Sequence, residues 1–245
     1  MKVSYDGTNY HGFQKQNRTG LRTVQEALEE ALGILTRENI VVHGSGRTDA
    51  GVHASCQVIN FHSNTKIPAA RFPLAVNSVL PPDIVVYQAE DVSADFHARF
   101  SARKKTYCYT IFNERQMSPF WRFYAYHVPV WLDVDKMREG ADGFLGTHDF
   151  RAFCAKNTAV QNFTRTVFDC RIEKEGPLLR FFVQGNGFLY NMVRIITGTL
   201  MEIGKGRRES GEIPVLLAGR ERKLVGQTLP PQGLCLVAVE YSEKP

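Results

Sequence analysis

A single carboxylate stands out in the segment GSGRTDAGVHA, which runs from Gly44 to Ala54. Asp49 has no second acid within a helical turn, no cysteine at metal-binding spacing and no adjacent serine–histidine pair. An isolated Asp-x-Gly is typical of a turn, because both residue types favour turns. However, the surrounding glycines permit close approach of a ligand, and Arg47 offers a planar donor fork that suits a phosphate or a base edge. The segment therefore indicates either a turn or a carboxylate that does its chemistry alone.

A second segment, HARFSARKKTYCY, combines positive charge with aromatic rings. Basic side chains bind phosphates and aromatic faces stack on unpaired bases, whereas the alternative is a solvated strand edge on which lysine blocks pairing. In a strand, the two tyrosines would share a face and the two adjacent lysines would fall on opposite faces. One face could then offer a cation and a ring together. The residues concerned are Arg99, Arg103, Lys104, Lys105, Tyr107 and Tyr109.

A third candidate is Arg194, which lies in the apolar segment GFLYNMVRIITGTL. An arginine there must be paired or must reach water, because an unpaired buried charge is strongly destabilising. An ordinary structural ion pair would explain it. The sharper hypothesis makes Asp49 its partner, which would lower the pKa of Asp49 and keep that carboxylate ionised and oriented.

Other kinds of site find little support in the sequence. The Asp49 segment lacks the GxGxxG spacing and no GK[ST] follows it, which argues against dinucleotide and P-loop binding. The five cysteines form no CxxC and the seven histidines no HxxxH or HExxH, so we predict no metal site. Cys56 and Cys154 are interpreted as core residues, because nothing requires a histidine beside either.

Composition bounds the class of protein. The chain has 245 residues, 43% of them hydrophobic, which suits one large or two small globular domains. The net charge of +5 weakly favours binding to an anionic partner. No signal-peptide pattern precedes KVSYDG, and the most apolar stretch, Phe188 to Ile203, is shorter than a membrane span. With its scattered cysteines, the sequence predicts a cytoplasmic protein with free thiols and no membrane segment.

The elements that must position these residues alternate between strand pairs and helices, which favours an antiparallel α+β fold. Thr23 followed by Glu26 predicts a capping box at a helix start. The halves have similar element orders, divided near residues 99–105. Helices are predicted over residues 23–36, 69–79, 133–144, 188–203 and 214–218, and strands over 2–5, 39–46, 55–63, 83–91, 104–113, 123–128, 166–176, 178–187 and 234–241.

Together these segments resemble the tRNA pseudouridine synthase A family over almost the whole chain. The resemblance rests on YDGTNYHGFQ, LRTVQEALE, GSGRTDAGVHA, FHARFSARKKTYCY, GTHDFRAFC, GFLYNMVRIITGTL and PPQGLCL, in the family's order. One departure is that the first strand begins at Lys2 with little ahead of it, so some N-terminal residues are expected to be missing.

The resemblance implies a cofactor-free isomerase that converts uridine to pseudouridine at positions 38, 39 and 40 of the tRNA anticodon stem-loop. It also implies a homodimer that binds tRNA across both subunits. Each subunit would have two similar α+β domains, residues 1–102 and 103–245, with antiparallel sheets forming a central sheet and helices packed on one face.

Roles are carried over by motif. Asp49 matches the catalytic aspartate, Tyr107 the tyrosine that stacks on the target uracil, Arg47 a residue tied to flipping the base, and Arg194 the arginine paired with the catalytic acid. The basic residues Arg103, Lys104 and Lys105 are expected to help bind the substrate.

The chemistry suits a lone carboxylate. The reaction breaks a C–N bond and forms a C–C bond between the same sugar and the same ring, so no group leaves and neither metal nor nucleotide cofactor is needed. The carboxylate could add to the anomeric carbon, add to the uracil ring or remove a sugar proton, and all three routes stay open. Two rivals remain: a non-catalytic RNA-binding module, and a hydrolase that would need a second acid, for which Asp6 is the nearest candidate.

Overall fold

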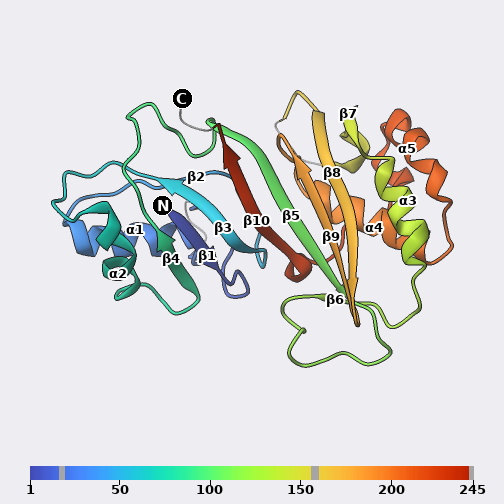
Figure 1. The fold of residues 1–245 in the computed structure, drawn as a ribbon, viewed down its shortest axis with the longest axis horizontal. Coiled ribbons are helices and arrows are strands. Elements are labelled where there is room, and N and C mark those ends of the chain that lie inside the picture. The colour runs from blue at the N-terminus through green and yellow to red at the C-terminus, as the bar shows by residue number, and fades with distance from the viewer. Residues whose placement is uncertain (17–19, 156–159, 243–245) are drawn as a thin grey trace. The chain divides into compact units, whose positions relative to one another are not determined.

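The computed structural model describes residues 1–16, 20–155 and 160–242, and the chain divides into two compact units (Figure 1). The first unit comprises Met1–Arg103 and Cys235–Pro245, and the second comprises Lys104–Leu234. The predicted division after residue 102 places the closing strand in the second domain, whereas in the structure that strand groups with the first. The reason is a long-range pairing that local sequence patterns do not reveal, in which Cys235 lies opposite His53 in a parallel ladder.

The first unit contains a mainly antiparallel sheet. Its strands lie in the order β4 (Ile84–Gln88), β1 (Lys2–Tyr5), β3 (His53–Asn60) and β10 (Leu234–Tyr241), with the short β2 (His43–Gly44) also paired to β3. Only the pairing of β10 with β3 is parallel among those described for this sheet. Alternate residues such as Val3 and Val86 are buried, whereas Val85 and Tyr87 are exposed on the other face.

In the described residues of this unit there are two α-helices. The helix α1 (Val24–Thr36) begins with the predicted capping box: Thr23 accepts from the Glu26 backbone, and the Glu26 carboxylate accepts from the Thr23 backbone. Its apolar stripe, including Leu28 and Leu32, is buried in the core. The helix α2 (Phe72–Asn77) follows a short 3₁₀ turn and is shorter than predicted.

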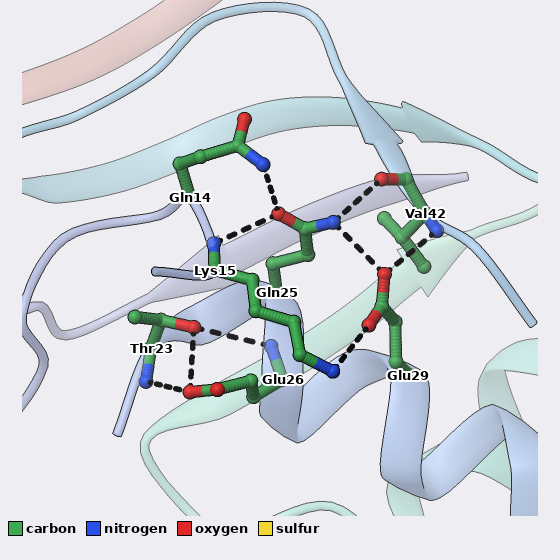
Figure 2. A network of polar contacts seen from close by, with 7 residues as sticks. All are labelled: Gln14, Lys15, Thr23, Gln25, Glu26, Glu29 and Val42. Carbon is green, nitrogen blue, oxygen red and sulfur yellow. Dashed lines mark hydrogen bonds and ion pairs between the residues drawn. The ribbon is translucent and has the colours of Figure 1, made fainter. Parts of the chain in front are cut away.

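The strand predicted over residues 39–46 is reduced to β2, and the cause lies in α1 (Figure 2). The Val42 N–H donates to Glu29 Oε1 at 3.1 Å, and the Val42 carbonyl accepts from Gln25 Nε2 at 3.2 Å. Because helix side chains take both backbone groups of Val42, that residue does not enter a strand ladder.

The second unit contains an antiparallel sheet in the order β5 (Ala102–Phe112), β9 (Leu178–Gly185), β8 (Thr164–Glu175) and β7 (Gly146–Asp149). The predicted hairpin of long strands is confirmed as β8 and β9, while β7 was not predicted. The strand predicted over residues 123–128 shrinks to β6 (Tyr126–His127), which pairs in parallel with β5. Tyr124 and Ala125 instead donate to the carbonyl of Trp121 in a turn.

Among its described residues, the second unit also contains the α-helices α3 (Val134–Asp142), α4 (Met192–Gly204) and α5 (Ile213–Gly219). Asp133 caps α3 as predicted, accepting from the Lys136 N–H. The helix α4 begins later than predicted because Asn191 has a left-handed φ of 61°. The predicted α+β class is confirmed. None of the helices in the described ranges is long and apolar enough to cross a membrane.

Candidate active site

The backbone of Asp49 forms a tight turn between β2 and β3. Its carbonyl accepts from the Val52 N–H at 3.1 Å, and Gly51 at the third turn position has a φ of 75°, as a type II turn requires. The turn interpretation is therefore correct for the backbone. The Asp49 residue itself is half-buried rather than enclosed in the core, so the structure is compatible with a catalytic role for its carboxylate.

Buried polar side chains of β1 and β3 hold the residues just before Asp49. The Tyr5 hydroxyl lies 2.8 Å from Thr48 Oγ1, and burial raises the pKa of Tyr5, so its hydroxyl stays protonated at neutral pH. Gln57, fully buried on β3, accepts from the Ser45 hydroxyl at 2.5 Å and donates to the Gly46 carbonyl at 2.9 Å. These contacts hold the residues on the N-terminal side of Asp49 in one conformation.

Further along the segment YDGTNYHGFQ, Gly12 and Phe13 contact the backbone of the turn. Phe13 N–H donates to the Thr48 carbonyl at 3.0 Å. Gly12, with a φ of 84°, lies so close that a Cβ built on it would stand 2.6 Å from Thr48 O and 3.2 Å from the carbonyl carbon of Asp49. Only glycine satisfies both that φ and that approach.

Arg47 is exposed and held at one nitrogen. Its Nε donates to Gln14 Oε1 at 3.1 Å. A guanidinium held at Nε can still donate from Nη1 and Nη2, which form the edge that grips a phosphate or a base. The structure thus places Arg47 in the same turn region as Asp49, two residues away.

Tyr107 lies on β5 in the second unit, opposite Val183 of β9, and is 8% exposed. Phe188 packs edge-on against it, with ring centroids 5.1 Å apart and an interplanar angle of 82°. Such an aromatic pair contributes about 0.5–1.5 kcal/mol beyond area burial. Phe188 therefore fixes the plane of the predicted stacking ring.

The predicted basic residues separate along β5. Arg103 is exposed, and its Nε donates to Ser242 Oγ at 3.0 Å in the first unit. Lys104 Nζ lies 5.3 Å from the ring centroid of Phe168 in the second unit. By strand alternation, Lys105 shares the face of Tyr107 while Lys104 points to the other face. That Lys105 and Tyr107 act together on a substrate stays a prediction.

Arg194 lies in the first turn of α4 and is half-buried. Its Nε donates to the Leu229 carbonyl at 2.6 Å and its Nη1 to Asn191 Oδ1 at 2.7 Å. Asn191 has the left-handed φ that delays the helix, and its side chain orients Arg194 instead of capping α4. These contacts orient the guanidinium. Its pairing with Asp49, which belongs to the other unit, stays a prediction.

The strand β5, which carries Tyr107, and the helix α4, which carries Arg194, both bind the segment Leu229–Pro230. The Tyr109 hydroxyl donates to the Pro230 carbonyl at 2.7 Å, next to the Leu229 carbonyl that Arg194 binds. Desolvation raises the pKa of Tyr109, while the nearby Arg194 charge opposes that rise. Tyr107 and Arg194 therefore belong to one scaffold within the second unit.

Comparison with known proteins identifies the class. A profile of a family described as tRNA pseudouridine synthase matches residues 1–101 and 141–242. The chain belongs to the tRNA pseudouridine synthase family. The tRNA pseudouridine synthase A of Acetivibrio thermocellus is 47% identical over 239 residues, which cover 98% of this chain and 97% of the relative. That of Moorella thermoacetica is 48% identical over 241 residues, covering 98% of each.

The family predicted from the sequence is thereby confirmed, and with it the enzyme class, an isomerase that acts on tRNA uridine. One solved structure, of a Cbf5-Nop10-Gar1 complex, matches with a TM-score of 0.36 at 13% identity, covering 97% of this chain and 57% of that chain. That similarity is too low to support an argument.

Several residues that support this pseudouridine synthase site were missed by sequence reasoning. Gln14 contacts Arg47 and Phe188 contacts Tyr107, each from far along the chain, and Gln57 holds Ser45 and Gly46, just before Arg47. The signal for Gln14 and Gly12 was present, since both lie in the quoted segment YDGTNYHGFQ, but nothing in the sequence named their partners. Phe188 was assigned to the apolar face of a helix that in fact begins after it.

The remaining candidates for chemistry are weaker. Burial raises the pKa of the Cys154 thiol, which is the opposite of what activates a nucleophile. Within residues 1–16, 20–155 and 160–242, no group of three or more His, Cys, Asp or Glu side chains could hold a metal ion.

Gly12→Ala should reduce pseudouridine formation by about tenfold or more, because the new methyl group would push the Thr48–Asp49 backbone out of place. Gly20→Ala is the matched control: Gly20 also has a positive φ, of 63°, but a Cβ there meets nothing within 4 Å. Single-turnover rates of both variants test this. Equal losses would show that strain at φ, rather than contact with the Asp49 turn, is responsible.

Phe188→Leu should slow the reaction by roughly tenfold, because the Tyr107 ring loses the aromatic edge that fixes its plane. Phe182→Leu is the matched control. Phe182 is next to Val183, the partner of Tyr107 on β9, so its side chain points to the other face of the sheet. There Arg171 Cζ lies 4.5 Å from the centroid of the Phe182 ring. Rates measured at saturating tRNA should fall only for the Phe188 variant. A similar fall in both would indicate general loosening of the sheet.

Proposed function

We propose that this chain converts uridine to pseudouridine at positions 38, 39 and 40 of the tRNA anticodon stem-loop, with Asp49 as its catalytic carboxylate. The observation that carries the proposal is the Asp49 turn in a chain of this family. The acid is half-buried, Gln57 and Tyr5 hold the residues before it, and Gly12 approaches its backbone closely. A turn held by several contacts suits a carboxylate that must meet one atom of a flipped nucleoside.

The other residues take roles that fit their surroundings. Tyr107, with its ring plane fixed by Phe188, would stack on the uracil and hold it while it turns between C–N and C–C attachment. Arg47 would occupy the place of the extruded base or grip its phosphate from Nη1 and Nη2. Arg194, oriented by Leu229 and Asn191, would keep Asp49 ionised.

Binding of tRNA would depend mainly on phosphate contacts. Modification of three adjacent positions requires recognition of shape rather than of one base edge. Arg103, Lys104 and Lys105 are proposed to contribute to that grip. Affinity should therefore fall steeply between 50 and 200 mM salt, by about a factor of ten or more for a few phosphate contacts. A flat salt response in filter binding would argue against a phosphate-gripping surface.

Two features of the proposal come from the family resemblance. The chain would be cytoplasmic, and it would act as a homodimer with one tRNA contacting both subunits. Light scattering on the purified protein tests the dimer, which should have twice the chain mass of 27.7 kDa.

The direct test of the function is incubation with unmodified tRNA, followed by nucleoside analysis. Pseudouridine supports the proposal, free uracil would indicate a hydrolase, and an unchanged nucleoside profile with intact binding would indicate an RNA-binding module. Cytidine placed at positions 38, 39 and 40 should abolish product formation. Product that persists in such a tRNA would contradict the assigned positions.

A further inference from the structure

Gln25 is a buried amide, 6% exposed, whose hydrogen-bonding groups are all engaged (Figure 2). Its Oε1 accepts from Gln14 Nε2 at 2.7 Å and from the Lys15 N–H at 2.9 Å. Its Nε2 donates to Glu29 Oε1 at 2.8 Å and to the Val42 carbonyl at 3.2 Å. Two donors on one side and two acceptors on the other allow only one orientation of this amide.

That orientation dictates the orientation of the next amide. Because Gln25 presents its oxygen to Gln14, the Gln14 amino group must face Gln25, and its oxygen must face away. The Gln14 oxygen is the atom that accepts from Arg47 Nε at 3.1 Å. A flipped Gln14 would set nitrogen against Arg47 and oxygen against the oxygen of Gln25. The contacts of Gln25 in α1 therefore fix the orientation of the Gln14 amide, and that amide presents its oxygen to Arg47.

We propose that Gln14 is a positioning residue for the pseudouridine synthase reaction, which acts by holding the Arg47 guanidinium in the orientation needed at the Asp49 turn. This inference rests on the proposed function. Gln14 fixes Arg47 at Nε and leaves the Nη1–Nη2 edge directed to the RNA. An exposed arginine without such a contact would lose considerable rotamer entropy on engaging its substrate, and the contact with Gln14 reduces that loss.

A purely structural role is the alternative. The same amides fasten residues 14 and 15 to α1, so removing one could simply loosen the segment that braces the Asp49 turn. The two roles differ in their dependence on Arg47. If Gln14 acts through Arg47, its removal costs nothing further once the Arg47 side chain is gone, whereas a structural loss persists.

The experiment is a double-mutant cycle with Gln14→Met and Arg47→Met, measured by single-turnover formation of pseudouridine in unmodified tRNA. Gln14→Met keeps the side-chain length, and Gln25 Oε1 retains the Lys15 N–H as a donor. Thr23→Ala is the matched control, because it removes the capping hydroxyl of α1 without touching Gln14 or Gln25 (Figure 2). Melting temperature and tRNA dissociation constant are measured for every variant.

Gln14→Met should slow the single-turnover rate about tenfold while the dissociation constant stays within about twofold. The double variant should match Arg47→Met within about twofold, and Thr23→Ala should keep the wild-type rate even though it lowers the melting temperature. Additive rate losses, a wild-type rate for Gln14→Met, an effect on affinity alone, or an equal loss in Thr23→Ala would each overturn the inference. A wild-type protein that makes no pseudouridine would instead overturn the proposed function.

Discussion

Asp49→Ala should lower pseudouridine formation by at least about ten thousandfold, the loss expected when the reacting group of an active site is removed. Each turnover exchanges the uracil C5 hydrogen for a bond to the sugar, so release of that hydrogen from labelled tRNA measures the chemistry directly. Tyr5, Gln57 and Phe13 hold residues Ser45 to Thr48 through contacts that Asp49→Ala does not remove. The melting temperature of the variant shows whether its fold is kept.

Binding of tRNA provides the internal control for Asp49→Ala. Phosphate contacts by other side chains dominate affinity, so the dissociation constant should change by no more than about threefold. An Asp49→Ala protein that binds normally and releases hydrogen at near the wild-type rate would remove Asp49 from the chemistry. If the Asp49→Ala protein neither binds tRNA nor melts cooperatively, Asp49→Asn, which keeps the size of the side chain, is measured instead.

Arg194→Met should slow the reaction by about a hundredfold to a thousandfold, the range found when a preorganised electrostatic contact is lost from an active site. If Arg194 keeps Asp49 ionised, its removal makes the charged form of Asp49 less favourable. The acid limb of the rate profile should then move to higher pH, and part of the lost activity should return as the pH is raised. Rates measured across a pH series test both statements.

Arg222→Met is a matched control for Arg194→Met. Arg222 donates to the Gly226 carbonyl and to Thr228 Oγ1, both at 2.9 Å, and so holds the same segment that Arg194 holds at Leu229. Both variants should loosen that segment and lower the melting temperature. Only the Arg194 variant should shift the pH profile, and a shift in both would attribute the effect to the segment rather than to the Arg194 charge.

Local patterns in the sequence predicted the elements that local physics determines. The capping box at Thr23 and Glu26, the cap at Asp133 and the alternating burial of β8 and β9 depend on residues a few positions apart. The sharp turn at Asp49 and Gly51 is likewise local. For these features, spacing and residue type were sufficient.

The differences arise where residues far apart in the sequence meet in the fold. Residue 42 looked like part of a strand, but Gln25 and Glu29 of α1 take its N–H and carbonyl. The closing strand β10 pairs with β3, far away in the sequence, so its grouping with the first unit was not visible. Gln14 is separated from Arg47 by 33 residues, and no periodicity connects them. Such contacts form only when the chain folds, so the spacing of residues in the sequence does not reveal them.

In the proposed function one carboxylate, Asp49, performs the isomerisation, and Asp6 is the rival for a second acid. Its Oδ1 accepts from both the N–H of Thr8, at 2.9 Å, and the Thr8 hydroxyl, at 2.5 Å, as in a local turn, and lies 3.1 Å from His53 Nδ1. The decisive measurement is nucleoside analysis of tRNA treated with Asp6→Asn or Asp49→Asn protein. We expect pseudouridine at near the wild-type yield from Asp6→Asn and none from Asp49→Asn. Free uracil from either protein, or an Asp6→Asn protein as inactive as Asp49→Asn, would contradict isomerisation by one carboxylate.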